Sequence, residues 1–427
     1  YRQNSNYLIR KDWDLNRMNN RLNMHLKHNY KYKEGNGSLV IKLETSALSS
    51  DYNYSKICLE NKYITKFKKL KINTRSFFQL GSGDNWAEES KLTLSGANSE
   101  EMIKNWERLQ EHTAKAFKYF SKTFGKYPYS KYSVIQGGDG GMEYPMATLI
   151  TGERSYPSLL SVTIHEALHS WYQMILGTNE SYYAWMDEGF TSFAQNITQY
   201  ELFNDIYDLD PINPLINSYD RYLKFLEDDI EEPLTTHSDH FSTNRAYGVG
   251  SYTKGAIFLS QLGYIIGDEI LYKGLRRYYN EWKFRHPDKN DFIRIIEKES
   301  GLELDWYLDY WIGTTHKIDY SLELVNSNRD KITLDIKKIE NMPMPIELEV
   351  LYSDNTKKII YIPLSIMRGE KKFKSEENVI IMSDWEWVND SYTIMLDIKE
   401  KLIKSITIDP KKKLADYNRK NNFLEIN

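Results

Sequence analysis

The chain has 427 residues, with 56 Lys and Arg against 60 Asp and Glu, and a formal net charge of −4. Its length suits two or three domains, and its weak net charge gives no reason to expect a nucleic-acid partner. No apolar run approaches the ~20 residues that a membrane span needs, so we expect no transmembrane segment. Cys58 is the only cysteine and cannot form an intrachain disulfide.

The first 95 residues give the weakest signals of secondary structure in the chain. They are rich in Asn, Lys and Tyr, and their apolar periodicity is weak. A short strand is expected over residues 38–43 and another over residues 91–94. We interpret residues 1–95 as the remnant of a truncated, β-rich N-terminal domain.

Residues 96–315 show mainly helical periodicity. Apolar side chains recur at intervals of three and four over residues 99–124, which predicts an amphipathic helix. A strand over residues 132–136 and an edge strand over residues 141–146 follow, separated by a Gly-rich turn. The segments beyond them are again helical, so the pattern predicts a mainly helical domain with a small sheet.

The pattern changes after Thr315. Six or more short segments alternate apolar and polar residues between positions 318 and 408, with turn residues between them. Such spacing is typical of a β-sandwich of immunoglobulin or fibronectin type. We therefore expect residues 316–427 to form a C-terminal β-sandwich with a tail, and the whole chain to be a multidomain α+β protein.

The motif that carries most chemistry is His165-Glu166-Ala167-Leu168-His169, which matches the H-E-x-x-H pattern. Two histidines four residues apart on a helix project from one face and can bind the same ion. Glu166 lies one step round the helix, where it can touch a water as a general base without being a ligand. The motif therefore predicts a metal site with a base beside it.

An acidic residue, Glu188, lies 19 positions after His169 and opens a second expected helix. A carboxylate from a following helix completes a set of three ligands and leaves one position open, which is the arrangement of catalytic zinc sites. We therefore predict one Zn²⁺ per chain, held by His165, His169 and Glu188. Asp187 either orients a zinc ligand or caps the helix that Glu188 begins.

Three motifs together resemble those of the aminopeptidase N family, the gluzincin zinc aminopeptidases of peptidase family M1. They are the zinc motif with Asp-Glu-Gly-Phe at 187–190, Gly-Gly-Met-Glu-Tyr at 140–144, and Tyr-Thr-Lys-Gly at 252–255. The form Gly-Gly-Met-Glu-Tyr-Pro is closest to a bacterial subgroup typical of Bacteroidetes. The resemblance implies a thermolysin-like catalytic domain over residues 96–315. It also implies a secreted or periplasmic location, although no signal peptide is visible in the chain.

The same resemblance assigns substrate-binding roles residue by residue. Glu143 would bind the free α-amine of a peptide, because a carboxylate at a fixed distance from the metal selects a chain terminus. The edge strand through Gly141, Met142 and Tyr144 would pair with the substrate backbone. Its glycines would permit that close approach.

Two tyrosines complete the implied site. Tyr252 would donate a hydrogen bond to the oxyanion of the tetrahedral intermediate, and Tyr247 would either line the pocket or pack in the core. The implied function is removal of N-terminal residues from peptides with a free N-terminus. The alternatives are a zinc endopeptidase, against which Glu143 argues, and a catalytically disabled peptide-binding fragment. The oligomeric state has no signature in the sequence.

Overall fold

The computed structural model of the chain describes residues 21–32, 35–46, 53–67, 70–85, 100–138, 140–328, 330–374, 378–398 and 401–426. The chain divides into two compact units, Tyr1–Gly96 and Ala97–Asn427.

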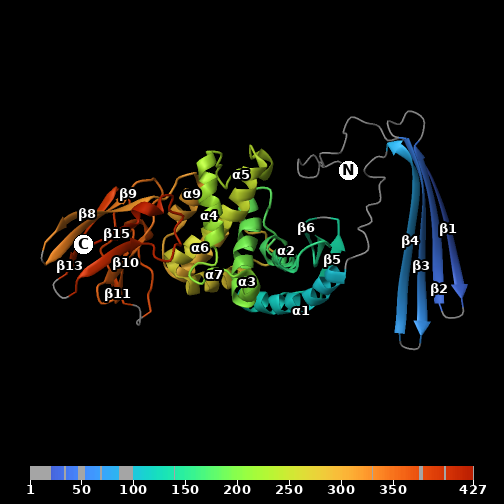
Figure 1. Ribbon diagram of the computed structural model, residues 1–427, viewed down its shortest axis with the longest axis horizontal. Helices are drawn as coiled ribbons and strands as arrows, with labels where there is room; N and C mark the ends of the chain where they lie inside the picture. Colours follow the sequence, from blue (N-terminus) through green and yellow to red (C-terminus); the bar gives the residue numbers. More distant parts are fainter. Residues whose placement is uncertain are drawn as a thin grey trace. The chain divides into compact units, whose positions relative to one another are not determined.

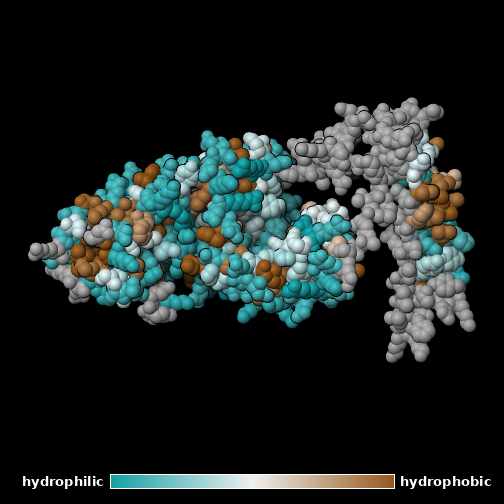
Figure 2. All heavy atoms as spheres, viewed as in Figure 1, coloured by the Kyte–Doolittle hydropathy of each residue, from teal (hydrophilic) through white to brown (hydrophobic). Residues whose placement is uncertain are grey.

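The first unit is a four-stranded antiparallel sheet in chain order (Figure 1). Its strands are β1 (Arg21–Tyr32), β2 (Gly35–Ser46), β3 (Asn53–Phe67) and β4 (Leu70–Asn85). The register aligns two rows of apolar residues across all four strands: Met24, Leu43, Ile57 and Leu80, then Leu26, Ile41, Leu59 and Phe78. Alternate residues of a strand share a face, so both rows make one face of this sheet apolar (Figure 2). The strand expected over residues 38–43 lies inside β2, and residues 91–94 lie outside the described residues.

Helices form the first part of the second unit. They are α1 (Glu100–Thr123), α2 (Tyr156–Leu168), α3 (Phe190–Tyr207), α4 (Ile216–Phe225), α5 (Asn244–Gly248), α6 (Gly255–Ile266), α7 (Asp268–Trp282), α8 (Lys289–Ser300) and α9 (Asp305–Gly313). Three π-helical turns join or extend them: η2 (Ser170–Ile175), η3 (Trp185–Gly189) and η6 (Val249–Lys254). Short 3₁₀ turns occur at η4 (Leu226–Asp228), η5 (Ser238–His240), η7 (Ser365–Met367) and η8 (Arg419–Asn421). The amphipathic helix predicted over residues 99–124 is α1.

A small sheet packs against α2. Its strand order is β5 (Ser133–Gly137), β7 (Ala147–Thr151), β6 (Gly141–Tyr144), with β5 parallel and β6 antiparallel to β7. The strand β6 is therefore an edge strand. It ends at Tyr144 rather than at residue 146 as predicted, because Pro145 has no amide hydrogen for a ladder and Met146 turns the chain at a φ of 60°.

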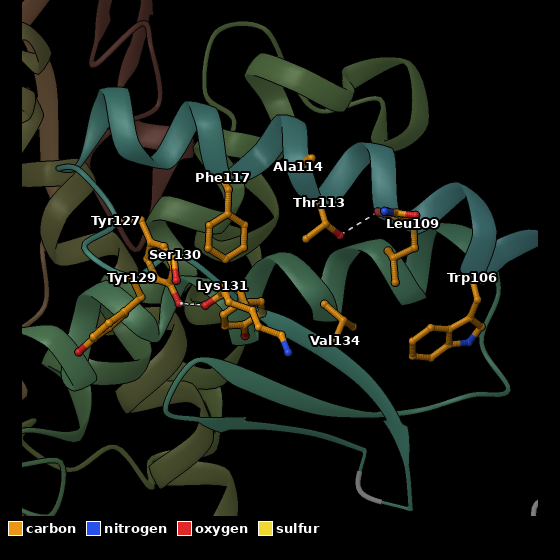
Figure 3. A pocket seen from close by; sticks show the side chains of 12 residues that line it. Trp106, Leu109, Thr113, Ala114, Phe117, Tyr127, Tyr129, Ser130, Lys131 and Val134 are labelled. Carbon is orange, nitrogen blue, oxygen red and sulfur yellow. Dashed lines mark hydrogen bonds between the residues drawn. The ribbon is translucent and has the colours of Figure 1, made fainter. Parts of the chain in front are cut away.

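The helix α1 packs over this sheet through aromatic side chains. The ring of Phe117 lies 4.9 Å from that of Tyr132 and 5.7 Å from that of Trp171, measured between centroids. A pocket of about 420 Å³ remains between α1 and the segment from Tyr127 to Val134 (Figure 3). Trp171 donates from Nε1 to the carbonyl of Gly125 at 2.7 Å. These contacts hold the segment that follows α2 against the end of α1.

Strands form the rest of the second unit, in two sheets of order β12-β11-β10-β14-β15 and β13-β9-β8. The strands are β8 (Tyr320–Ser327), β9 (Lys331–Lys338), β10 (Ile346–Tyr352), β11 (Lys357–Ile362), β12 (Val379–Ile381), β13 (Ser391–Asp397), β14 (Ile403–Ile408) and β15 (Phe423–Glu425). Buried Lys371 links these strands to the helices, since its Nζ contacts Glu347 of β10 and the carbonyl of Tyr264 in α6. The observed class is thus α+β. Among the described residues, no helix combines the length and the apolarity that crossing a bilayer requires.

Candidate metal centre

Three side chains from two helical segments converge on one point. His165 and His169 lie at the end of α2, and Glu188 lies in η3. The two Nε2 atoms are 3.3 Å apart, and each of them lies 3.2 Å from Glu188 Oε2. A tetrahedral zinc with bonds of about 2.0–2.1 Å separates its ligand atoms by about 3.3 Å. The triangle of donor atoms therefore has the size that zinc requires.

Each imidazole is oriented by a partner on its other nitrogen. His169 Nδ1 lies 2.6 Å from Asp187 Oδ1, and His165 Nδ1 lies 3.0 Å from Gln195 Oε1. The Gln195 amide is itself fixed, because its Nε2 donates to the carbonyl oxygen and to Oγ of Ser161, both at 2.9 Å. Since both partners accept, each Nδ1 carries the proton and each Nε2 presents its lone pair to the metal. Asp187 thus contacts a predicted ligand directly.

Glycines bring the turn that carries Glu188 against the turn that carries Tyr252. η3 ends at Gly189, and Gly255 follows η6. A Cβ atom on Gly189 would lie 2.6 Å from the Cα atom of Gly255, and one on Gly255 would lie 2.9 Å from the Cα atom of Gly189. Because neither residue has a side chain, the turns approach closely enough for the Tyr252 hydroxyl to donate to Glu188 Oε1 at 2.5 Å. π-Helical turns are rare and occur frequently at functional sites.

Tyr252 also stacks on His165, a predicted metal ligand. Its ring lies 5.8 Å from that of His165, at an interplanar angle of 11°. Burial, and then the neighbouring carboxylate of Glu188, raise the pKa of Tyr252 far above its ordinary value. The hydroxyl therefore stays protonated and is available as a hydrogen-bond donor beside the metal.

Glu166 lies between the two histidines in sequence and faces β6. A Cβ atom on Gly141 would lie 2.5 Å from Glu166 Oε1, so the missing side chain of Gly141 provides the space for this carboxylate. Burial raises the pKa of Glu166 to about 7, against the lowering effect of His165 and His169. The charge of a bound Zn²⁺ would lower that pKa again. The result is a buried carboxylate that ionises more readily when the metal is bound and can then accept a proton.

Glu143 approaches the same centre from the edge strand β6. One of its carboxylate oxygens lies within 4.8 Å of the potential ligand atoms of His169 and Asp187. Burial raises its pKa, because water cannot fully solvate the charge. Within the described part of the chain, no Lys or Arg forms an ion pair with Glu143. Because no described Lys or Arg neutralises this mostly buried carboxylate, it favours the binding of a cationic ligand.

Comparison with known proteins identifies a family match over the part of the chain that contains these residues. Residues 109–311 match the family described as the peptidase family M1 domain. This stretch contains the three predicted zinc ligands, together with Glu143, Glu166 and Tyr252. The chain therefore contains a peptidase family M1 domain over residues 109–311. Its metal is Zn²⁺, in agreement with the size and chemistry of the donor triangle.

The M1 relatives are longer than this chain. Human aminopeptidase B is 30% identical over 207 residues, which cover 44% of this chain and 29% of the relative. Leucine aminopeptidase 2 of Aspergillus fumigatus is 26% identical over 276 residues, covering 58% of this chain and 42% of the relative. The structure of Legionella pneumophila aminopeptidase A in complex with aspartic acid covers 93% of this chain and 42% of its own, with a TM-score of 0.50 and 15% identity, which is a likeness of fold. The chain thus spans less than half the length of these relatives.

The other residues predicted to bind substrate, Met142, Tyr144 and Tyr247, lie around the metal centre. Met142 and Tyr144 are exposed on β6, where the Met142 carbonyl accepts a hydrogen bond from Thr148 Oγ1 at 2.9 Å. Tyr247 is half-buried, and its ring packs edge-on at 5.6 Å from Phe241 and 6.5 Å from Tyr252. Tyr247 therefore lies beside Tyr252 and has packing contacts as well.

Sequence reasoning missed Gln195, although a signal was present. Gln195 follows Glu188 by seven residues, which is two helical turns, so both lie on the face of one helical segment that meets α2. A polar residue at that spacing from a predicted ligand is a candidate partner for a metal-binding histidine. Ser161, which accepts a hydrogen bond from the Gln195 amide, was missed as well. It lies four residues before His165, on the same face of α2.

Proposed function

We propose that this chain is a zinc-dependent aminopeptidase that hydrolyses the N-terminal residue from peptides. The observation that carries the proposal is Glu143, a mostly buried carboxylate beside the metal centre, without a cationic partner among the described residues. A peptide bound with its α-ammonium at Glu143 places its first peptide bond near the metal. Internal segments of a peptide offer no such ammonium, so the arrangement favours an exopeptidase over an endopeptidase.

The chain's own residues divide the reaction between them. Bound Zn²⁺ supplies a Lewis acid that polarises the substrate carbonyl and makes water acidic enough to react at neutral pH. Glu166 takes a proton from the attacking water and passes it to the leaving amine. Tyr252 leaves Glu188 Oε1 and donates its hydrogen bond to the oxyanion that forms at the carbonyl. The free edge of β6 pairs with the substrate backbone and orients it.

The architecture proposed with this function has three parts. Residues 96–315 form a thermolysin-like catalytic domain, and residues 316–427 form an immunoglobulin- or fibronectin-like sandwich with a tail. The two sheets of β8–β15 support the second assignment. The sheet of β1–β4 forms a separate β-rich N-terminal unit.

The test is hydrolysis of leucyl-aminomethylcoumarin by purified, zinc-loaded protein. We expect turnover that a chelator abolishes and that one equivalent of zinc per chain restores. A folded protein that binds zinc and hydrolyses neither this substrate nor a peptide with a free N-terminus would support the disabled peptide-binding fragment instead. One peptide compared with a free and with a blocked N-terminus separates an aminopeptidase from an endopeptidase.

A further inference from the structure

A pocket of about 680 Å³ is lined by residues that follow Glu143 and His169 closely in the chain. One wall is the turn after β6, with Pro145 and Met146. Another wall starts at Ser170, the residue after the zinc ligand His169, and continues through η2 to Ser181. The pocket is thus built from the two segments that carry the proposed amine-binding residue and a zinc ligand.

Glu180 gives this pocket its charge. Among the described residues that line the pocket, Glu180 is the only carboxylate, and none is Lys or Arg. Glu180 is exposed, and it forms no ion pair with any described residue. Burial is the main cause of the raised pKa of Glu143, and the charge of Glu180 adds a smaller contribution.

Gln173 holds the Glu180 carboxylate in place. Its Nε2 donates to Glu180 Oε2 at 2.7 Å. The backbone of Gln173 has a φ of 115° and a ψ of −62°, a conformation that residues with a side chain rarely adopt. Such conformations concentrate at ligand sites, where surrounding structure maintains them. The neutral Gln173 amide orients Glu180 without neutralising its charge.

We propose that this pocket receives the side chain of the substrate's N-terminal residue and that Glu180 selects a cationic side chain, Lys or Arg. The inference rests on the proposed function, because it takes the α-ammonium to lie at Glu143. A side chain that leaves the α-carbon beside Glu143 enters the adjoining pocket. Met146 and Met174 line that pocket and suit the methylene stem of Lys or Arg, while Glu180 pairs with the charged head.

The test compares substrates that differ only in the distal charge. The pairs are lysyl- against norleucyl-aminomethylcoumarin and arginyl- against citrullyl-aminomethylcoumarin, with kcat/KM measured on the zinc-loaded full chain. We expect the cationic member of each pair to be favoured about threefold to fivefold, because Glu180 is exposed to solvent. Glu180→Gln should reduce this ratio to near one. Gln173→Gly removes the amide that orients Glu180, and glycine adopts the backbone φ of 115° at this position readily. This variant should reduce the kcat/KM ratio only in part.

A matched control is Glu201→Gln, which removes an exposed carboxylate on α3, away from the pocket. The ratio should stay at the wild-type value in this variant. A wild-type ratio near one would overturn the selectivity and leave the aminopeptidase function standing. The same conclusion follows if Glu180→Gln lowers kcat/KM for both members of a pair equally.

A binding experiment separates failure of the pocket from failure of the function. If the protein hydrolyses none of these substrates, the proposed function fails, and calorimetry with L-lysinamide and L-norleucinamide tests the pocket. Tighter binding of L-lysinamide, lost in Glu180→Gln, would support a cation-selective pocket. Equal binding of the two amides would overturn it.

Discussion

Replacing Gly141 by alanine tests the placement of the general base. The Cβ atom would lie 2.5 Å from Glu166 Oε1 and 2.6 Å from Val162 Cγ1. Ordinary contact begins at about 3.4 Å, so the Glu166 carboxylate or the strand β6 must move by about 0.9 Å. Because the three zinc ligands are not touched, we expect zinc content to stay at one per chain.

The expected cost is larger for catalysis than for stability. Overpacking by one methyl group costs about 1–3 kcal/mol of unfolding free energy. A displacement of about 1 Å in a catalytic group costs roughly 10²-fold in rate. We therefore expect Gly141→Ala to retain its fold and zinc and to lose about two orders of magnitude in kcat.

The assay is kcat for leucyl-aminomethylcoumarin, together with zinc content and thermal unfolding. Gly138→Ala is the matched control, because a Cβ atom at Gly138 meets no atom within 4 Å. It should have wild-type kcat. If Gly141→Ala also has wild-type kcat while folded and zinc-loaded, Glu166 is not the base at the position described.

The other predictions concern the groups around the metal. His165→Ala should lower zinc content measured by metal analysis, whereas Glu166→Gln should keep the zinc and lose roughly 10²–10⁴-fold in kcat; zinc loss in the second variant would contradict its assignment as a non-ligand. Tyr252→Phe should keep the fold and zinc and lose ~10²–10³-fold in kcat, and unchanged turnover would reassign Tyr252 to packing. Gln195→Met removes the acceptor for His165 Nδ1 at similar volume, so chelator competition should show zinc affinity reduced by ~10–100-fold. Unchanged affinity would mean that Gln195 does not orient His165.

The convergence of the three candidate zinc ligands was predictable because their geometry is local. His165 and His169 share a helix face at a spacing of four residues, and the acidic residue that completes the site follows at a short distance in sequence. The partner Gln195 was equally accessible from its spacing to Glu188. The residues that would bind the metal, and the residue that orients one of its ligands, thus follow from helical periodicity once a metal site is assumed.

Contacts between distant segments were not predictable from periodicity. The approach of Gly189 to Gly255 joins turns 66 residues apart, and π-helical turns do not follow the 3.6-residue pattern on which the sequence reasoning relies. The pairing of Gln173 with Glu180 depends on a backbone φ of 115° at a residue whose type does not suggest it. Such features appear only when the segments are placed in space.

The N-terminal strands illustrate a different limit. β1 alternates Leu22, Met24 and Leu26 with polar residues, yet Asn and Lys dominate the composition and disfavour a strand assignment. The register with β2 and β3 gives these apolar positions a shared face, and that pairing is not visible in any single strand.

The most direct test of the aminopeptidase function is the effect of N-acetylation on kcat/KM, measured with one peptide substrate in free and acetylated forms. Acetylation removes the α-ammonium and leaves the buried Glu143 carboxylate without a partner, at a cost of roughly 2–5 kcal/mol, or about 30-fold to several-thousand-fold in kcat/KM. Glu143→Ala should remove most of that difference by slowing the free-amine substrate. If the wild-type protein instead cleaves the acetylated peptide internally at a comparable rate, it is an endopeptidase and the function assigned to Glu143 is wrong.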